Sequence, residues 1–198
     1  MKVLIAVPVG EGGGLSPTWS LKLPNLLKYI PGDYEIQVIK GFTVDVAREF
    51  SVKIAKQKKA EYLFFLDSDV VPDKDDTILQ LISWKLPVVC GVYRLKRVDA
   101  QVFPFSINKW DYQKNNYRYL VPEDIPKNWR LIPIDGGGLG ICLIDMAVFN
   151  DIVEPYFKCQ LYPWNTPPGA LSEVPSFFKK LIAKSIETYA DLTITASH

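Results

Sequence analysis

Residues 62–69 read Tyr62-Leu63-Phe64-Phe65-Leu66-Asp67-Ser68-Asp69, an apolar run that ends in two carboxylates one residue apart. A short apolar run bounded by charged residues is typical of a strand buried on both faces of a parallel sheet. Open α/β sheets bind their ligands beyond the carboxyl ends of such strands. We therefore expect Asp67 and Asp69 to lie at the functional edge of a sheet.

The spacing of the two aspartates indicates a cation site. If extended backbone continues through Ser68, side chains 67 and 69 point to the same side, where their like charges repel each other. A hard divalent cation with oxygen ligands would relieve that repulsion. The alternative is that one aspartate only ends the strand or caps the next helix, although Asp75 and Asp76 are better placed for capping.

The composition predicts one globular domain with no nucleic-acid partner. A chain of 198 residues that is 48% hydrophobic and 23% charged can bury roughly 70% of its unfolded surface, which is enough for one core. The net charge of +1 lacks the basic footprint of a nucleic-acid-binding protein. No apolar segment reaches the roughly 18 to 20 residues of a transmembrane helix. We expect a single domain over residues 1–198.

The cysteines and the N-terminal segment predict a cytoplasmic protein. Cys90, Cys142 and Cys159 are widely spaced, with neither a zinc spacing nor a dense disulfide framework. We expect buried thiols in a reducing compartment, and one internal bridge stays open as an alternative. The apolar run 2–9 is followed by glycines and not by a cleavage site, so it predicts a first strand and not a signal peptide.

Strand and helix patterns alternate through the first half of the chain. Strand patterns at 3–7, 34–39, 62–66 and 88–92 are separated by helical patterns, which predicts right-handed winding of a mostly parallel sheet. Aromatic-rich runs at 102–121 predict a small antiparallel excursion. The predicted fold class is therefore α/β.

The amphipathic segment 44–59 is expected to form a helix. Its apolar spacing predicts that Val46, Ala47, Phe50, Val52 and Ile54 face the core. Its lysines are expected to form a solvated face, and contact with an anionic membrane surface is the alternative. These lysines are Lys53, Lys56, Lys58 and Lys59.

The order of several motifs resembles the nucleotide-sugar-dependent glycosyltransferases of the GT-A fold, most closely the family-2 type. The motifs are Ala6-Val7-Pro8, Asp45-Val46-Ala47-Arg48, Asp67-Ser68-Asp69, the glycine-rich segment 136–140, Ser172-Glu173 and His198. The resemblance covers nearly the whole chain and is to compact forms such as those found in archaeal viruses. It implies a Rossmann-like GT-A domain with a nucleotide-binding half, residues 1–93, and an acceptor-side half, residues 94–198.

The resemblance also implies a reaction and its partners. A sugar would pass from a nucleoside-diphosphate donor of the UDP or GDP type to a hydroxyl acceptor, and inversion is the expected outcome. The acceptor would be a glycan, a protein or a lipid-linked sugar, and a lipid acceptor would require peripheral attachment to the membrane. If the source is viral, the location would be the host-cell cytoplasm.

A divalent metal follows from the same resemblance. Asp69 would ligate Mn²⁺ or Mg²⁺ bridging the donor phosphates, and Asp67 would bind the ribose or support the metal shell. Such a metal offsets the charge that develops on the departing nucleoside diphosphate. His198 would complete the metal site, and its imidazole suits Mn²⁺.

Further residues are assigned to donor binding by the resemblance. Small residues let the backbone approach a ligand closely. An arginine near the start of a helix is unfavourably placed relative to the helix dipole, so its presence needs another reason. The residues assigned are Pro8, Val9, Gly10, Arg48, Ser68, Gly137 and Gly138.

The catalytic base is where the chain departs from the family pattern. Inverting members use the aspartate of a Glu-Asp pair near the start of the last helix, whereas this chain reads Glu173-Val174. Glu173 is one candidate base and Asp151 is the other. Either carboxylate must reach the acceptor oxygen directly or through one water.

Two other functions are compatible with the sequence. The run from Leu66 to Val71 also fits the aspartyl-phosphate motif of haloacid-dehalogenase-like phosphatases, with Asp67 as nucleophile. The two winding units before the motif argue against that function. The incomplete Glu-Asp pair leaves open a protein that binds sugar nucleotides without catalysis.

Overall fold

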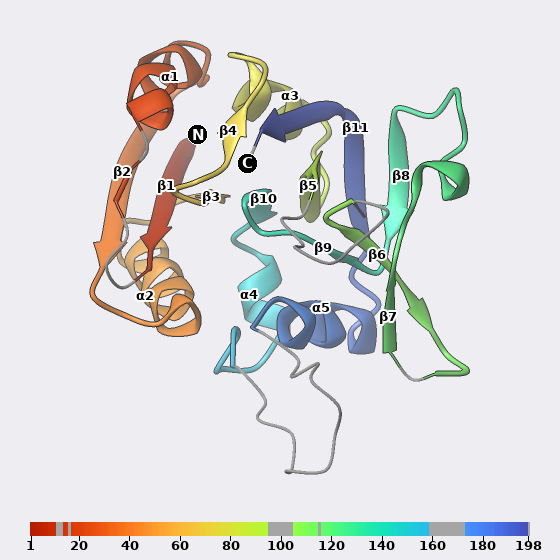
Figure 1. The fold of residues 1–198 in the computed structure, drawn as a ribbon. Coiled ribbons are helices and arrows are strands. Elements are labelled where there is room, and N and C mark those ends of the chain that lie inside the picture. The colour runs from red at the N-terminus through yellow and green to blue at the C-terminus, as the bar shows by residue number, and fades with distance from the viewer. Residues whose placement is uncertain (11–13, 16, 95–104, 115, 159–172, 198) are drawn as a thin grey trace.

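The computed structural model describes residues 1–10, 14–15, 17–94, 105–114, 116–158 and 173–197 (Figure 1). A large central sheet has the strand order β2-β1-β3-β10-β5-β11-β4, and β8 also pairs with β11. Its strands are β1 (Lys2–Val9), β2 (Asp33–Lys40), β3 (Tyr62–Leu66), β4 (Val71–Pro72), β5 (Val88–Tyr93), β8 (Leu131–Ile134), β10 (Ile141–Asp145) and β11 (Thr188–Ser197).

A second, smaller sheet and the helices complete the fold. The small sheet has the order β7-β6-β9 and is antiparallel. Its strands are β6 (Ile107–Asp111), β7 (Asn116–Tyr119) and β9 (Gly136–Gly137). The helices are α1 (Pro17–Lys28), α2 (Val44–Gln57), α3 (Thr77–Ser83), α4 (Val148–Asp151) and α5 (Glu173–Ala183), with a 3₁₀ turn at Pro122–Asp124. No helix among the described residues is long and apolar enough to cross a membrane.

The central sheet is mixed. Strands β2, β1 and β3 are parallel, as are β5 and β11, but β10 is inserted antiparallel between β3 and β5. The predicted α/β class with a mostly parallel sheet and a small antiparallel part is confirmed. Because parallel strands end at the same edge of a sheet, the residues after β1, β3 and β5 lie along one edge.

Two apolar layers cover the faces of this sheet. On one face, Val52 of α2 and Phe177 of α5 pack with Leu4 of β1. On the other, Trp19 of α1 and Leu81 of α3 belong to the second buried cluster. The side chains of β1 alternate between these clusters, as a strand buried on both faces requires.

The orientation of α2 differs from the expected one. The helix buries Ala47, Arg48, Ser51, Val52 and Ala55. Val46 and Phe50 are 37% and 42% exposed, so the prediction that these two side chains face the core is wrong. The reason is that the helix turns its arginine inward, toward two carboxylates, and the rotation carries the neighbouring apolar positions outward.

The expectation of buried thiols is confirmed for the described cysteines. Cys90 of β5 and Cys142 of β10 are fully buried, lie opposite each other in register and are free thiols. Burial raises the pKa of the Cys142 thiol. Cys159 lies outside the described residues.

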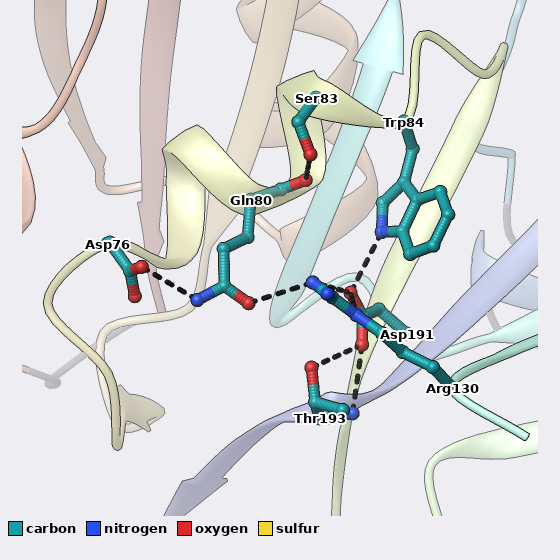
Figure 2. A network of polar contacts seen from close by, with 7 residues as sticks. All are labelled: Asp76, Gln80, Ser83, Trp84, Arg130, Asp191 and Thr193. Atoms are coloured by element: carbon teal, nitrogen blue, oxygen red, sulfur yellow. Dashed lines mark hydrogen bonds and ion pairs between the residues drawn. The ribbon is translucent and has the colours of Figure 1, made fainter. Parts of the chain in front are cut away.

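A buried aspartate holds an irregular part of β11 in place (Figure 2). The register of β11 against β5 shifts between Ala190 and Thr195. Inside this shift, the fully buried carboxylate of Asp191 accepts hydrogen bonds from the indole of Trp84 at 2.8 Å and from the backbone and hydroxyl of Thr193 at 2.9 and 2.7 Å. The network fixes the bend through which β11 reaches β4.

The same network ties β11 to the start of β8 and to α3. Arg130 forms an ion pair with Asp191 at 3.3 Å, and its Nη2 donates to Gln80 Oε1 at 3.1 Å. Gln80 in turn donates to Asp76 at 2.7 Å. Figure 2 shows Trp84 after α3, Arg130 before β8 and Thr193 of β11 converging on the one carboxylate.

Candidate functional site

The two aspartates of the opening motif lie in a turn. Strand β3 ends at Leu66, and the backbone amide of Val70 donates to the carbonyl of Asp67 at 3.1 Å. Extended backbone therefore does not continue through Ser68, and the condition on which strand alternation would place both side chains on the same side is not met. The Asp67 side chain is 26% exposed, and Asp69 is exposed.

A buried arginine joins two carboxylates from distant parts of the chain. Arg48 on α2 is 2% exposed, and its Nη2 donates to both Asp67 oxygens at 3.1 and 3.3 Å. Its Nε lies 3.5 Å from Glu173 Oε1 at the start of α5. The guanidinium also lies over the ring of Phe65, 5.1 Å from its centroid. Three elements thus converge on one cation.

The electrostatics of this cluster keep Arg48 charged. Burial lowers the pKa of the guanidinium, but the carboxylates of Asp67 and Glu173 raise it by more, so the net shift is upward. Two carboxylates on one guanidinium leave the cluster with an excess of negative charge. A further cation would be attracted to it.

The cluster lines a cavity of about 230 Å³. Within the described part of the chain, Arg48 Nε and Nη1 are buried and make no hydrogen bond, and neither does Asn108 Oδ1. Buried polar atoms of this kind normally have a partner, so the cavity offers donors and an acceptor to a ligand. The lining residues are Arg48, Asp67, Tyr93, Ser106, Asn108, Tyr119, Gly137, Gly138, Leu139, Glu173, Val174 and Pro175.

Glycines allow the backbone to form one wall of this cavity. The segment expected to be a loop contains the short strand β9, in which Gly136 and Gly137 pair with Asn108 and Ile107. Beyond it, the amide of Gly138 donates to Ser106 O at 2.5 Å. The segment is anchored to the motif because the amide of Asp67 donates to Gly140 O at 3.1 Å.

Tyr93 occupies the space that side chains at positions 138 and 140 would need. Its hydroxyl accepts a hydrogen bond from the Gly140 amide at 3.1 Å. A Cβ on Gly140 would lie 2.7 Å from the Tyr93 Oη, and one on Gly138 would overlap the same oxygen. Burial, followed by the charge of Asp67, raises the pKa of Tyr93, so this hydroxyl stays protonated.

The substitution Gly138→Ala is expected to destabilise the protein by about 1 to 3 kcal/mol, because its methyl group overlaps the buried tyrosine. Gly10→Ala is the control, since a Cβ there meets nothing within 4 Å. Thermal unfolding followed by circular dichroism measures both. In a Tyr93→Phe background the penalty should shrink, and equal melting temperatures for the two alanine variants would contradict the expectation.

Several predicted residues lie at the same edge of the sheet without lining the cavity. Pro8 and Val9 end β1, which is the parallel neighbour of β3, and both are buried. Gly10 follows them and is exposed. Ser68 is half-buried within the turn between the two aspartates. Their assignment to donor binding stays a prediction.

The two candidate bases lie at opposite edges of the sheet. Glu173 borders the cavity and is 6% exposed. Asp151 ends α4, which follows β10, and the antiparallel pairing of Asp145 with Tyr62 places that end of β10 beside the start of β3. The structure therefore brings Glu173, and not Asp151, beside Asp67.

The end of β11 approaches the same turn. Ser197 pairs with Val71, two residues after Asp69, so the last described residue lies beside the motif. His198 itself lies outside the described residues. Within the described part of the chain, no group of three or more potential ligands could hold a metal ion.

Some cavity residues were not predicted from the sequence. Tyr93, Asn108 and Tyr119 line the cavity, and only the first had a usable signal, since it directly follows the apolar strand pattern at 88–92. Asn108 and Tyr119 belong to the small sheet and line the cavity from there. No local sequence pattern indicates how the small sheet lies relative to the large one.

Comparison with known proteins identifies the fold. No protein-family model matches the sequence, and no curated protein matches it. The structure is similar to the viral protein A197 from STIV, with a TM-score of 0.63 and 25% identity, over 100% of this chain and 85% of that one. The fold is GT-A-like. It is also similar to a mannose-1-phosphate geranyltransferase from Thermus thermophilus, with a TM-score of 0.54 and 11% identity, over 99% of this chain and 75% of that one.

Proposed function

We propose that this GT-A-like protein is a metal-dependent glycosyltransferase that moves a sugar from a nucleoside-diphosphate donor to a hydroxyl acceptor. The nucleotide would bind in the half formed by residues 1–93 and the acceptor in the half formed by residues 94–198. The observation that carries the proposal is the buried Arg48, held between two carboxylates with guanidinium nitrogens that lack hydrogen bonds in the described residues and line a cavity.

This arginine suits a phosphorylated ligand. A guanidinium is planar and remains charged, and it binds phosphate oxygens through paired N–H groups. Among the described residues Nη1 makes neither a hydrogen bond nor an ion pair, so a donor phosphate or sugar oxygen would satisfy it without displacing Nη2 from Asp67 or Nε from Glu173.

The carboxylates around the turn suit Mn²⁺ or Mg²⁺. Asp67 and Asp69 offer hard oxygen ligands, and one guanidinium does not neutralise the acidic groups gathered there. These two residues would hold the metal, with His198 as the proposed third ligand. When bound, the ion would stabilise charge on the departing nucleoside diphosphate.

Glu173 is the residue we assign as the base. Its carboxylate lies at the cavity wall, and the ion pair with Arg48 fixes its direction. From there it could accept the proton of an acceptor hydroxyl as that oxygen attacks the sugar, which would give inversion. The alternative phosphatase reaction is disfavoured because both oxygens of Asp67, its required nucleophile, accept hydrogen bonds from Arg48.

Replacement of Asp69 by alanine is expected to weaken Mn²⁺-dependent binding of UDP or GDP by at least roughly 10- to 100-fold, because a charged metal ligand is lost. Isothermal titration calorimetry with and without Mn²⁺ measures the effect. Asp33→Ala is the matched control, since this exposed aspartate begins β2 at the opposite edge of the sheet.

Three results would argue against the proposal. Equal nucleotide affinity in wild type and Asp69→Ala would show that a metal held by Asp69 does not contribute to donor binding. Release of phosphate from a phosphomonoester by the wild type, with loss of this activity in Asp67→Asn, would favour the phosphatase function instead. Nucleotide binding with neither donor hydrolysis nor transfer would identify a sugar-nucleotide-binding protein without catalysis.

A further inference from the structure

The outward face of α2 and the turn before it carry an unusual group of exposed apolar residues. Phe42, Val44, Val46 and Phe50 are 41%, 37%, 37% and 42% exposed. They fall within nine consecutive residues, and together with Lys53 we call them the α2 patch. Large apolar side chains exposed as a group mark surfaces that contact a partner.

Four members of the patch, Phe42, Val46, Phe50 and Lys53, are joined by ring contact and helical spacing. The rings of Phe42 and Phe50 lie 5.0 Å apart, which joins the turn to the helix. Positions 46, 50 and 53 fall on one side of a helix, and the ammonium of Lys53 lies 5.9 Å from the Phe50 ring centroid. The opposite side of α2 is buried against the sheet, so this side faces outward.

The exposed charged side chains of α2 are all basic. The exposed residues of α2 are three apolar residues, two lysines and one glutamine, and none is acidic. The nearby carboxylates are engaged elsewhere: Asp45 accepts from the Thr43 hydroxyl at 2.5 Å, and Glu49 accepts from the Phe157 amide. Exposed Lys58 and Lys59 follow the helix, although Glu35 pairs with the former at 2.8 Å.

We propose that the α2 patch docks this protein on an anionic lipid surface. Apolar side chains next to lysines, with no exposed acid on the helix, match the acyl boundary and the anionic headgroups of such a surface. A second copy of the chain is a poorer match, because a symmetric contact would bring lysines against lysines.

Docking through this patch has a consequence for the acceptor. Arg48 lines the cavity from the buried side of the same helix, so the cavity would lie about one helix diameter, roughly 10 Å, from the lipid surface. The acceptor would then be a hydroxyl compound presented at that surface. This consequence rests on the proposed function, whereas the docking itself does not.

Vesicle sedimentation tests the docking with the full chain and no nucleotide. We expect the protein to sediment with phosphatidylcholine vesicles that contain phosphatidylserine, to do so much less with phosphatidylcholine alone, and to be released by high salt. The double variant Phe42→Ser/Phe50→Ser should bind roughly tenfold more weakly. Lys53→Glu should bind at least roughly fivefold more weakly.

Matched controls use exposed residues outside the patch. Leu21→Ser removes an apolar side chain that is 79% exposed on α1, and Lys184→Glu reverses an exposed charge after α5. Both should bind like wild type. Because all these positions are exposed, melting temperatures should stay close to the wild-type value.

Three results would overturn the docking proposal. One is the absence of sedimentation with anionic vesicles. Another is an equal loss of binding in the Leu21→Ser control. The third is a solution dimer, seen by light scattering and dispersed by Phe42→Ser/Phe50→Ser, which would assign the patch to a second copy. Vesicle binding without any nucleotide binding would instead count against the proposed function and leave the docking intact.

Discussion

Glu173→Gln is expected to lower the rate of sugar transfer by about 10²- to 10⁴-fold while leaving donor affinity nearly unchanged. The amide has nearly the shape of the carboxylate but cannot take a proton from the acceptor hydroxyl. Asp67 still pairs with Arg48 in this variant, so the guanidinium keeps one carboxylate partner. The effect should therefore fall on turnover and not on donor binding.

Transfer assays over a range of pH and donor titrations separate these two effects. Asp151→Asn is the matched control and should transfer at the wild-type rate, because α4 lies at the other edge of the sheet. Glu173→Asp should retain part of the activity, since a shorter carboxylate can still act through a water. A loss in Asp151→Asn with full activity in Glu173→Gln would reverse the assignment of the base.

Wild type and Glu173→Gln should also differ in their pH profiles. If Glu173 acts as a base, the acidic limb of the wild-type profile reports its protonation, and the residual activity of the glutamine variant should lack that limb. A residue that only supports the structure would lower the whole profile without changing its shape. The profile therefore distinguishes catalysis from positioning.

Much of the fold followed from local patterns. The run at 62–66 predicts β3 because a continuous apolar stretch of this length has few alternatives to a strand buried on both faces. Alternation with helical patterns then predicts the winding, and the carboxylates after β3 predict the functional edge. Arg48 and Glu173 were predicted as site residues from the order of the motifs and not from periodicity. In the structure Arg48 pairs with both Asp67 and Glu173.

Other features depend on contacts between distant segments. The apolar run of β10 is buried on both faces, so its pattern does not indicate the direction of the strand. Its antiparallel direction depends on the pairing with β3 and β5. In α2 the apolar spacing fits two faces of the helix. The choice is made by the pairing of Arg48 with two carboxylates far away in sequence, which explains the exposed Val46 and Phe50.

Asp191→Ala is expected to cost about 2 to 4 kcal/mol of unfolding free energy, because it removes a fully buried carboxylate and the several hydrogen bonds that it accepts. The indole of Trp84 and the amide of Thr193 lose a hydrogen bond, and Arg130 loses its ion pair (Figure 2). For a chain of this length the loss corresponds to roughly 10 °C in melting temperature. Denaturant unfolding measures it, with the exposed Asp33→Ala as a control that should change stability by less than about 0.5 kcal/mol.

The pH dependence of stability separates the charge of Asp191 from its shape. Burial raises the pKa of this carboxyl, but hydrogen bonds from Thr193 and Trp84 and the charge of Arg130 lower it below the ordinary value of 3.8. A lowered folded-state pKa stabilises the protein above the unfolded-state pKa of about 3.9, and the stabilisation is lost as pH falls through the folded-state value. Wild type should therefore lose stability below about pH 4, and Asp191→Asn should lose less over that range because its amide does not titrate. Parallel losses in both proteins would show that other carboxylates, and not Asp191, set the acid limit of the fold.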